Sequence, residues 1–200
     1  TTNFDYANSP NAFAEATVTL ANPLFNQRGG VIQNDENKDK ISNGSTVKIG
    51  QRQRVRLQID TNTDWDESKK VLKLQFSKNG ATFEDVRPAG EIRSAQSILT
   101  KGEREIGGPE AGDCPSGTTW NPRKVWNKNS GRKKVGAAYE ARNVTDAINL
   151  PSSTCDSVSF VVDTKNATAG AEYRFRLKNI TDNADLSNYY NCPSFKAVTA

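Results

Sequence analysis

The sequence predicts an all-β protein that folds as a two-sheet β-sandwich with a long loop-rich insertion. Three observations lead to this prediction. Several short segments alternate apolar and polar residues with a period of two, turn residues separate those segments, and no stretch shows the 3.6-residue period of an amphipathic helix. The chain has 200 residues, of which 34% are hydrophobic. This length suits one domain with a core of its own.

The first alternating segment lies near the N-terminus. Residues 11–25, NAFAEATVTLANPLF, read as a strand and precede the pair Gly29–Gly30, which we expect to interrupt regular structure. We therefore divide the chain into an N-terminal segment, residues 1–26, and a single sandwich domain, residues 27–200. A short strand is expected next at TVKIG, residues 46–50.

The clearest strand is RQRVRLQID, residues 52–60, in which Val55, Leu57 and Ile59 share one face. We expect that face to be buried and the arginines and glutamine between these positions to be in water. The segments VLKLQFS and TFEDV follow, separated by an Asn-Gly turn signal. We expect these three strands to form a β-meander.

The chain from about residue 88 to residue 150 is rich in Gly, Pro, Ser, Asn and charged residues. It is too long for a structureless connection inside a compact domain, so we expect short edge strands in it or an excursion that covers a flank. Alternation returns in DSVSFVVD, in AEYRFRLKN and in the closing SFKAVTA. With the opening segment, this makes about eight strands.

The three cysteines, Cys114, Cys155 and Cys192, are about forty residues apart in sequence and lack the close spacing of metal and redox motifs. The chain also contains no His, so a zinc site would depend on sulfur and carboxylate ligands alone. We expect one disulfide and one odd thiol. The pairing is open, although Cys114 with Cys155 would staple the long insertion.

Two blocks of the chain resemble Ig-like or fibronectin-like β-sandwich modules of bacterial extracellular surface proteins. In such modules an RxRxxI strand leads through a Trp-bearing loop to a KLQ(F/Y) strand, and a GxxYxFR strand precedes LxxY and a terminal strand. The matching residues here are Arg54, Arg56, Ile59, Trp65, Lys73, Leu74, Gln75, Phe76, Gly170, Tyr173, Phe175, Arg176, Leu186 and Tyr189. The resemblance implies an Ig-like or jelly-roll-like sandwich that serves as a building piece, including in pilin-like filaments. It implies no shared catalytic site.

The charge distribution disfavours a nucleic-acid partner. The 27 basic and 23 acidic residues are interspersed, and the net charge is +4. Basic residues do cluster around Trp120 and Trp126, between Arg123 and Lys134, where they could contact phosphates or acidic glycans. We favour the interpretation that this is a solvated loop whose two Trp rings cap the core.

The loop DTNTDWDE places Asp60, Asn62 and Asp64 at the first three ligand spacings of a calcium-binding EF-hand loop. However, Trp65 occupies the position of the turn glycine and Val71 that of the last acidic ligand. We therefore expect no metal or other cofactor and interpret the loop as a solvated hairpin loop, with a calcium ion there as the open alternative.

Four N-x-S/T sequons occur, and each lies in or beside a predicted turn. They are at Asn43, Asn143, Asn166 and Asn179. A turn position would permit glycosylation, but a chain this rich in Asn, Ser and Thr contains such tripeptides by chance.

Enzymatic chemistry has little support, and we expect a protein that is not an enzyme. Without His, the usual Ser or Cys triads and most general bases are absent. The absence of Met and a start at Thr1 lead us to expect a mature secreted or cell-surface protein, and there is no apolar run long enough to span a membrane.

The function that we predict is a structural subunit of an extracellular filament or cell-surface assembly. Its N-terminal segment would add as a strand to a neighbouring copy, through Phe13, Val18, Leu20 and Leu24. The partners would be copies of the same chain. The alternative is a glycan-binding adhesive module, in which exposed aromatic residues would contact surface glycans.

Overall fold

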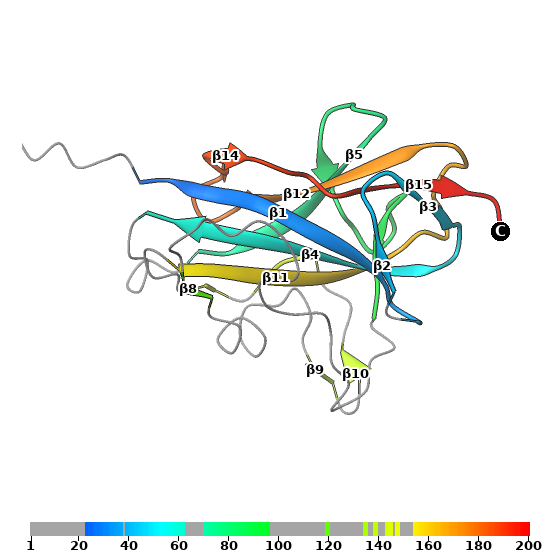
Figure 1. The fold of residues 1–200 in the computed structure, drawn as a ribbon, viewed down its shortest axis with the longest axis horizontal. Helices are drawn as coiled ribbons and strands as arrows, with labels where there is room; N and C mark the ends of the chain where they lie inside the picture. The colour runs from blue at the N-terminus through cyan, green and yellow to red at the C-terminus, as the bar shows by residue number, and fades with distance from the viewer. Residues whose placement is uncertain are drawn as a thin grey trace, which may run out of the picture.

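The structure is a computed structural model, and it shows two β-sheets packed face to face (Figure 1). It describes residues 23–37, 39–62, 70–96, 119–120, 134–135, 138–139, 143–145, 147–148 and 154–200. These residues contain strands and turns and no helix, and the two sheets do not close into a barrel. The predicted all-β, two-sheet fold class is confirmed.

The first sheet is built around three long antiparallel strands, with short strands at both edges. In spatial order it contains β14 (Asn188–Tyr189), β1 (Phe25–Asn34), β4 (Arg52–Thr61), β11 (Thr154–Asp163) and β7 (Arg93–Ser94), with β2 (Lys40–Ile41) paired to β1 and β8 (Thr119–Trp120) paired to β11. The short strands β7 and β8 lie in the predicted insertion. Each extends an edge of the sheet, as we expected of short strands in that insertion.

The second sheet is also antiparallel at its centre, and its C-terminal strand lies between the edge strand and the centre. In order it contains β3 (Ser45–Lys48), β15 (Ser194–Val198), β12 (Glu172–Asn179), β5 (Leu72–Lys78) and β6 (Glu84–Asp85), with β13 (Ala184–Asp185) paired to β12. A separate pair consists of β9 (Lys134–Val135) and β10 (Ala138–Tyr139). Apart from β1, the described strands of four or more residues therefore coincide with segments that alternate in the sequence.

The core lies between the sheets, and the alternating apolar positions supply it. Val55, Leu57 and Ile59 of β4 are fully buried, as predicted. In the second sheet Phe175 of β12 faces Phe76 of β5 in the ladder. The complete core cluster is Phe25, Ile32, Val47, Val55, Leu57, Ile59, Leu72, Leu74, Phe76, Val86, Ile92, Ile148, Val158, Phe160, Val162, Ala171, Tyr173, Phe175, Leu177, Leu186, Phe195 and Ala197.

The predicted β-meander is wrong. β4 belongs to the first sheet, whereas β5 and β6 belong to the second, so the chain between β4 and β5 crosses from one sheet to the other. β4 pairs with β1 and β11 instead, and β5 pairs with β12 and β6. Alternation shows which face of a strand is apolar, but it does not specify the neighbouring strand.

The prediction that the polar face of β4 is in water is also wrong. Arg54 is 1% exposed, Arg56 4% and Gln58 0%. Arg54 forms an ion pair with Asp35, which is itself completely buried. Burial and the positive charge of Arg54 lower the pKa of Arg56 to about 9. The first sheet is therefore buried on both faces along β4, and polar alternation alone does not show that.

The first described strand differs from the prediction as well. β1 begins only at Phe25 and continues through Gly29–Gly30, with a register shift between Gln27 and Gly29 that marks a β-bulge. Gly30 lies so close to β4 that a Cβ atom would come within 2.4 Å of the Arg56 carbonyl oxygen. Glycine is therefore required there for close approach and does not end the strand.

Candidate functional site

The candidate site is the end of the sandwich where the N-terminal segment joins β1. The backbone amide of Leu24 donates to Oδ1 of Asn62 at 2.7 Å. Phe25 and Ser187 are joined twice, because the Phe25 amide donates to Ser187 Oγ at 2.9 Å and the Ser187 amide donates to the Phe25 carbonyl at 2.7 Å. The start of β1 and the residue before it are thus held by hydrogen bonds on two sides.

The structure describes only one of the four predicted donor residues. Leu24 is described and is 38% exposed. Phe13, Val18 and Leu20 lie outside the described residues, and their pairing stays a prediction. The first described strand, β1, starts after all four of them.

Gln27, a residue that the sequence did not single out, connects the two sheets next to this junction. It is completely buried. Its Oε1 accepts a hydrogen bond from the Leu177 amide at 2.9 Å, and its Nε2 donates to the carbonyls of Asn191 at 2.9 Å and Phe175 at 3.3 Å. β15 pairs with the first residues of β12, and β13 pairs with its last residues. The Gln27 amide bonds to the part of β12 that lies between these two pairings.

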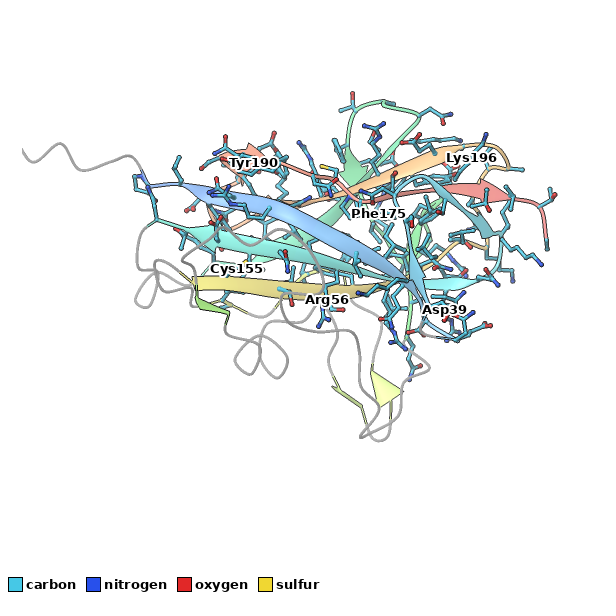
Figure 2. All side chains as sticks on the ribbon, in the orientation of Figure 1. Asp39, Arg56, Cys155, Phe175, Tyr190 and Lys196 are labelled. Carbon is cyan, nitrogen blue, oxygen red and sulfur yellow. The ribbon has the colours of Figure 1, made fainter. Side chains whose placement is uncertain are left out.

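A stacked pair lies on the outer surface beside Gln27. The Arg28 guanidinium carbon is 4.3 Å from the centroid of the Tyr190 ring, and Arg28 Nε bonds to Asp60 Oδ1 at 2.9 Å. Burial lowers the pKa of Arg28, but the hydrogen bond and the negative charge of Asp60 outweigh it, so the net pKa is raised. Tyr190 is 59% exposed and lies toward the end where β1 begins (Figure 2).

These contacts bear on the calcium alternative. Asp60 is bonded to Arg28, and the side chain of Asn62 accepts the Leu24 amide. Asp64 lies outside the described residues. Within the part of the chain that the structure describes, no group of three or more acidic or Cys side chains is placed to hold a metal ion. The described members of the predicted calcium set thus have structural partners in the protein.

The strand β3 forms an exposed edge at the other end of the molecule. Among the described strands β3 pairs only with β15. Thr46 and Lys48 are exposed, whereas Val47 points into the core. Figure 1 shows the start of β1 at the left end of the long axis and β3, together with the C-terminus, toward the right end. The two features are therefore separated along the longest dimension of the sandwich.

The cysteines differ in their state. Cys155 is completely buried in β11. Cys192 is a free thiol that is half-buried, and burial raises its pKa. Cys114 lies outside the described residues, so its pairing with Cys155 stays a prediction.

The four sequon asparagines differ in access. Asn43 and Asn166 are exposed. Asn143 is partly buried and donates to the Val86 carbonyl at 2.6 Å, and Asn179 is 6% exposed at the end of β12, where it bonds to Asp182 at 2.8 Å. All four side-chain amides donate hydrogen bonds, those of Asn43 and Asn166 to Asn191 Oδ1 and the Gly90 carbonyl at 3.3 Å, but only Asn43 and Asn166 combine exposure with turn positions.

A polar cluster at the other end of β12 carries the largest carboxylate pKa shift among the described residues. Oε1 of Glu91 accepts hydrogen bonds from Tyr173 Oη and Thr168 Oγ1, both at 2.6 Å, and from Lys78 Nζ at 2.8 Å. Burial alone would raise the pKa of Glu91, but these donors and the charge of Lys78 lower it to about 2. The cluster joins two loops to β5 and β12 and is structural.

No family model, curated protein or solved structure matches the chain. The resemblance to bacterial surface modules therefore stays a prediction. Among the described residues no helix is long and apolar enough to cross a membrane. The arguments that follow depend on the geometry of this chain.

Proposed function

We propose that the chain is a structural subunit of an extracellular filament or cell-surface assembly, in which the N-terminal segment of one copy adds as a β-strand to another. One observation carries the proposal: among the described residues the first strand, β1, begins at Phe25. The alternating apolar residues Phe13, Val18 and Leu20 precede it in the sequence. A segment with the pattern of a half-buried strand thus precedes the first described strand of the two-sheet core.

The exposed edge of β3 is the acceptor that fits best. An added strand gains main-chain hydrogen bonds from an unpaired edge and specificity from alternate side chains. β3 is the longest of the described edge strands, because β2, β6, β7, β8, β13 and β14 have two residues each. Its side chains Thr46 and Lys48 are exposed, and at its end the Lys48 carbonyl already accepts from the Gln51 amide and the Thr164 hydroxyl. Natural proteins keep such edges short to limit unwanted pairing.

The positions of donor and acceptor favour a filament over a closed dimer. The start of β1, which follows the donor segment in sequence, lies at one end of the long axis, and β3 lies toward the other end (Figure 1). A contact between two different surfaces of the same chain is heterologous, and it produces an open filament when the rotation between copies does not close a ring. Head-to-tail addition is therefore the arrangement that this geometry supports.

The test compares the whole chain with a variant lacking residues 1–22, both examined by light scattering and negative-stain microscopy. We expect fibres from the whole chain and folded monomers from the truncated variant. A synthetic peptide of residues 8–24 should bind the truncated variant, and the same peptide with Val18→Asp and Leu20→Asp should not. Polymers of the truncated variant would contradict strand donation from the N-terminus. A monomeric whole chain whose Trp fluorescence changes on adding polysaccharide would favour the glycan-binding module instead.

A further inference from the structure

We infer that Tyr190, stacked on Arg28, is the rigid contact through which the body of one copy docks against the body of its neighbour. The inference rests on the proposed function and adds to it a second contact outside the donated strand. Its occupant is another copy of this chain.

The first support is exposure. Among the described residues only two large hydrophobic side chains are exposed, Leu24 at 38% and Tyr190 at 59%. Both belong to the end of the sandwich where the N-terminal segment leaves, because Leu24 immediately precedes β1 and Tyr190 immediately follows β14, the strand paired to the start of β1. The exposed apolar surface of the described sandwich is thus concentrated at one place.

The second support is that Tyr190 is held in position although it is exposed. Its backbone amide donates to the Gln27 carbonyl at 3.0 Å, and its ring stacks on Arg28 at 4.3 Å. Asp60 in turn fixes the Arg28 guanidinium at 2.9 Å. A pre-positioned Tyr and Arg are typical of residues that dominate protein interfaces, because little side-chain entropy is lost on binding.

The third support concerns the occupant. The hydrogen bond from Leu24 to Asn62 fixes the exit of the N-terminal segment beside this surface. Leu24 and Arg28 are four residues apart, about 13 Å in an extended strand. A donated strand therefore brings the neighbouring body close to Tyr190. Asp60 balances the charge of Arg28, so the surface presents an aromatic face without a net charge, which suits a protein surface better than an anion.

The experiment uses the whole chain with Tyr190→Ser, and Tyr190→Phe and the exposed-residue variant Lys165→Ser serve as matched controls. Sedimentation gives the critical concentration for polymerisation. We expect Tyr190→Ser to raise it by about tenfold or more, as for a residue that dominates an interface, and both controls to stay near wild type. Binding of the residue 8–24 peptide to the truncated variant should not change with Tyr190→Ser, because the peptide makes no body contact.

A second measurement avoids any effect of substitution on folding. Hydroxyl-radical labelling of wild-type filaments should protect Tyr190 relative to the truncated monomer. Equal labelling of Tyr190 in the two states, or an unchanged critical concentration for Tyr190→Ser, would overturn the inference and leave strand donation intact. Loss of polysaccharide binding in Tyr190→Ser without any effect on assembly would also overturn it, in favour of a sugar platform. If wild type itself forms no polymer, the proposed function fails, and the inference fails with it.

Discussion

Replacing Gln27 by Met tests whether one buried amide joins the two sheets. Methionine has nearly the same length, but it can neither accept from the Leu177 amide nor donate to the carbonyls of Asn191 and Phe175. A buried polar group that loses its partner costs about 1–3 kcal/mol. The Leu177 amide should carry most of this cost, because the bond from Gln27 to Phe175 is long at 3.3 Å and a carbonyl tolerates a lost partner better. The easier burial of the thioether offsets part of the loss. We expect a net destabilisation of about 1–3 kcal/mol.

Urea unfolding followed by far-UV circular dichroism measures this free energy. With a slope of about 2 kcal/mol per molar urea, the midpoint should fall by about 0.5–1.5 M without a change in slope. Gln96→Met, at an exposed position, serves as the control and should shift the midpoint by less than about 0.3 M. If Gln27→Met behaves like this control, the reasoning that the amide completes the second sheet is refuted.

Two further predictions concern stability. Gly30→Ala should destabilise by about 2 kcal/mol or more, measured in the same urea assay, because the new methyl group meets the Arg56 carbonyl at 2.4 Å and the backbone has to shift; a neutral effect would mean that β1 and β4 can separate freely there. For Glu91, whose pKa is about 2 in the folded state against an ordinary 4.5, the stabilisation is fully present above about pH 4.5 and is lost as the pH falls toward 2. The stabilisation that Glu91 contributes is at most about 3 kcal/mol, and solvent screening of this partly exposed carboxylate reduces it to about 1–2 kcal/mol. Glu91→Gln should therefore flatten the fall of the melting temperature between pH 5 and pH 2, and an unchanged slope would contradict it.

The sequence predicted the central strands because their alternation reflects burial between two sheets. β4, β5, β11 and β12 all coincide with alternating segments. β1 was missed because Gly29–Gly30 reads as a break, whereas in three dimensions Gly30 allows close approach to β4. The predicted pairing of β4 was wrong for a related reason. Alternation shows which face of a strand is apolar, but it shows neither which strand is the neighbour nor whether the polar face is covered.

The candidate site was less accessible to sequence reasoning. The sequence does not distinguish Gln27, Arg28 and Tyr190 from other residues. Only the pairing of β1 with β14 brings Tyr190 next to the other two. The signal that could have found them is the bulge that a Gly-Gly pair indicates once it is placed inside a strand. The donor residues, by contrast, were predicted from the alternation in the opening segment. Their addition to a neighbouring copy is a proposal, which the truncation experiment tests.

The strength of edge addition can be judged from its parts. A strand beside the four residues of β3 gains a few main-chain hydrogen bonds, each with a net value of about 0.5–1.5 kcal/mol. Association costs about 4–15 kcal/mol in lost freedom, so these bonds alone do not hold two copies together. Burial of Phe13, Val18 and Leu20 would add about 1.5–3 kcal/mol each if they found apolar surface. Because the described core is already filled by the chain's own strands, that surface has to come from the neighbouring body. A stable filament of this chain therefore requires a contact between bodies as well as a donated strand, and Tyr190 is the exposed aromatic side chain placed to provide it.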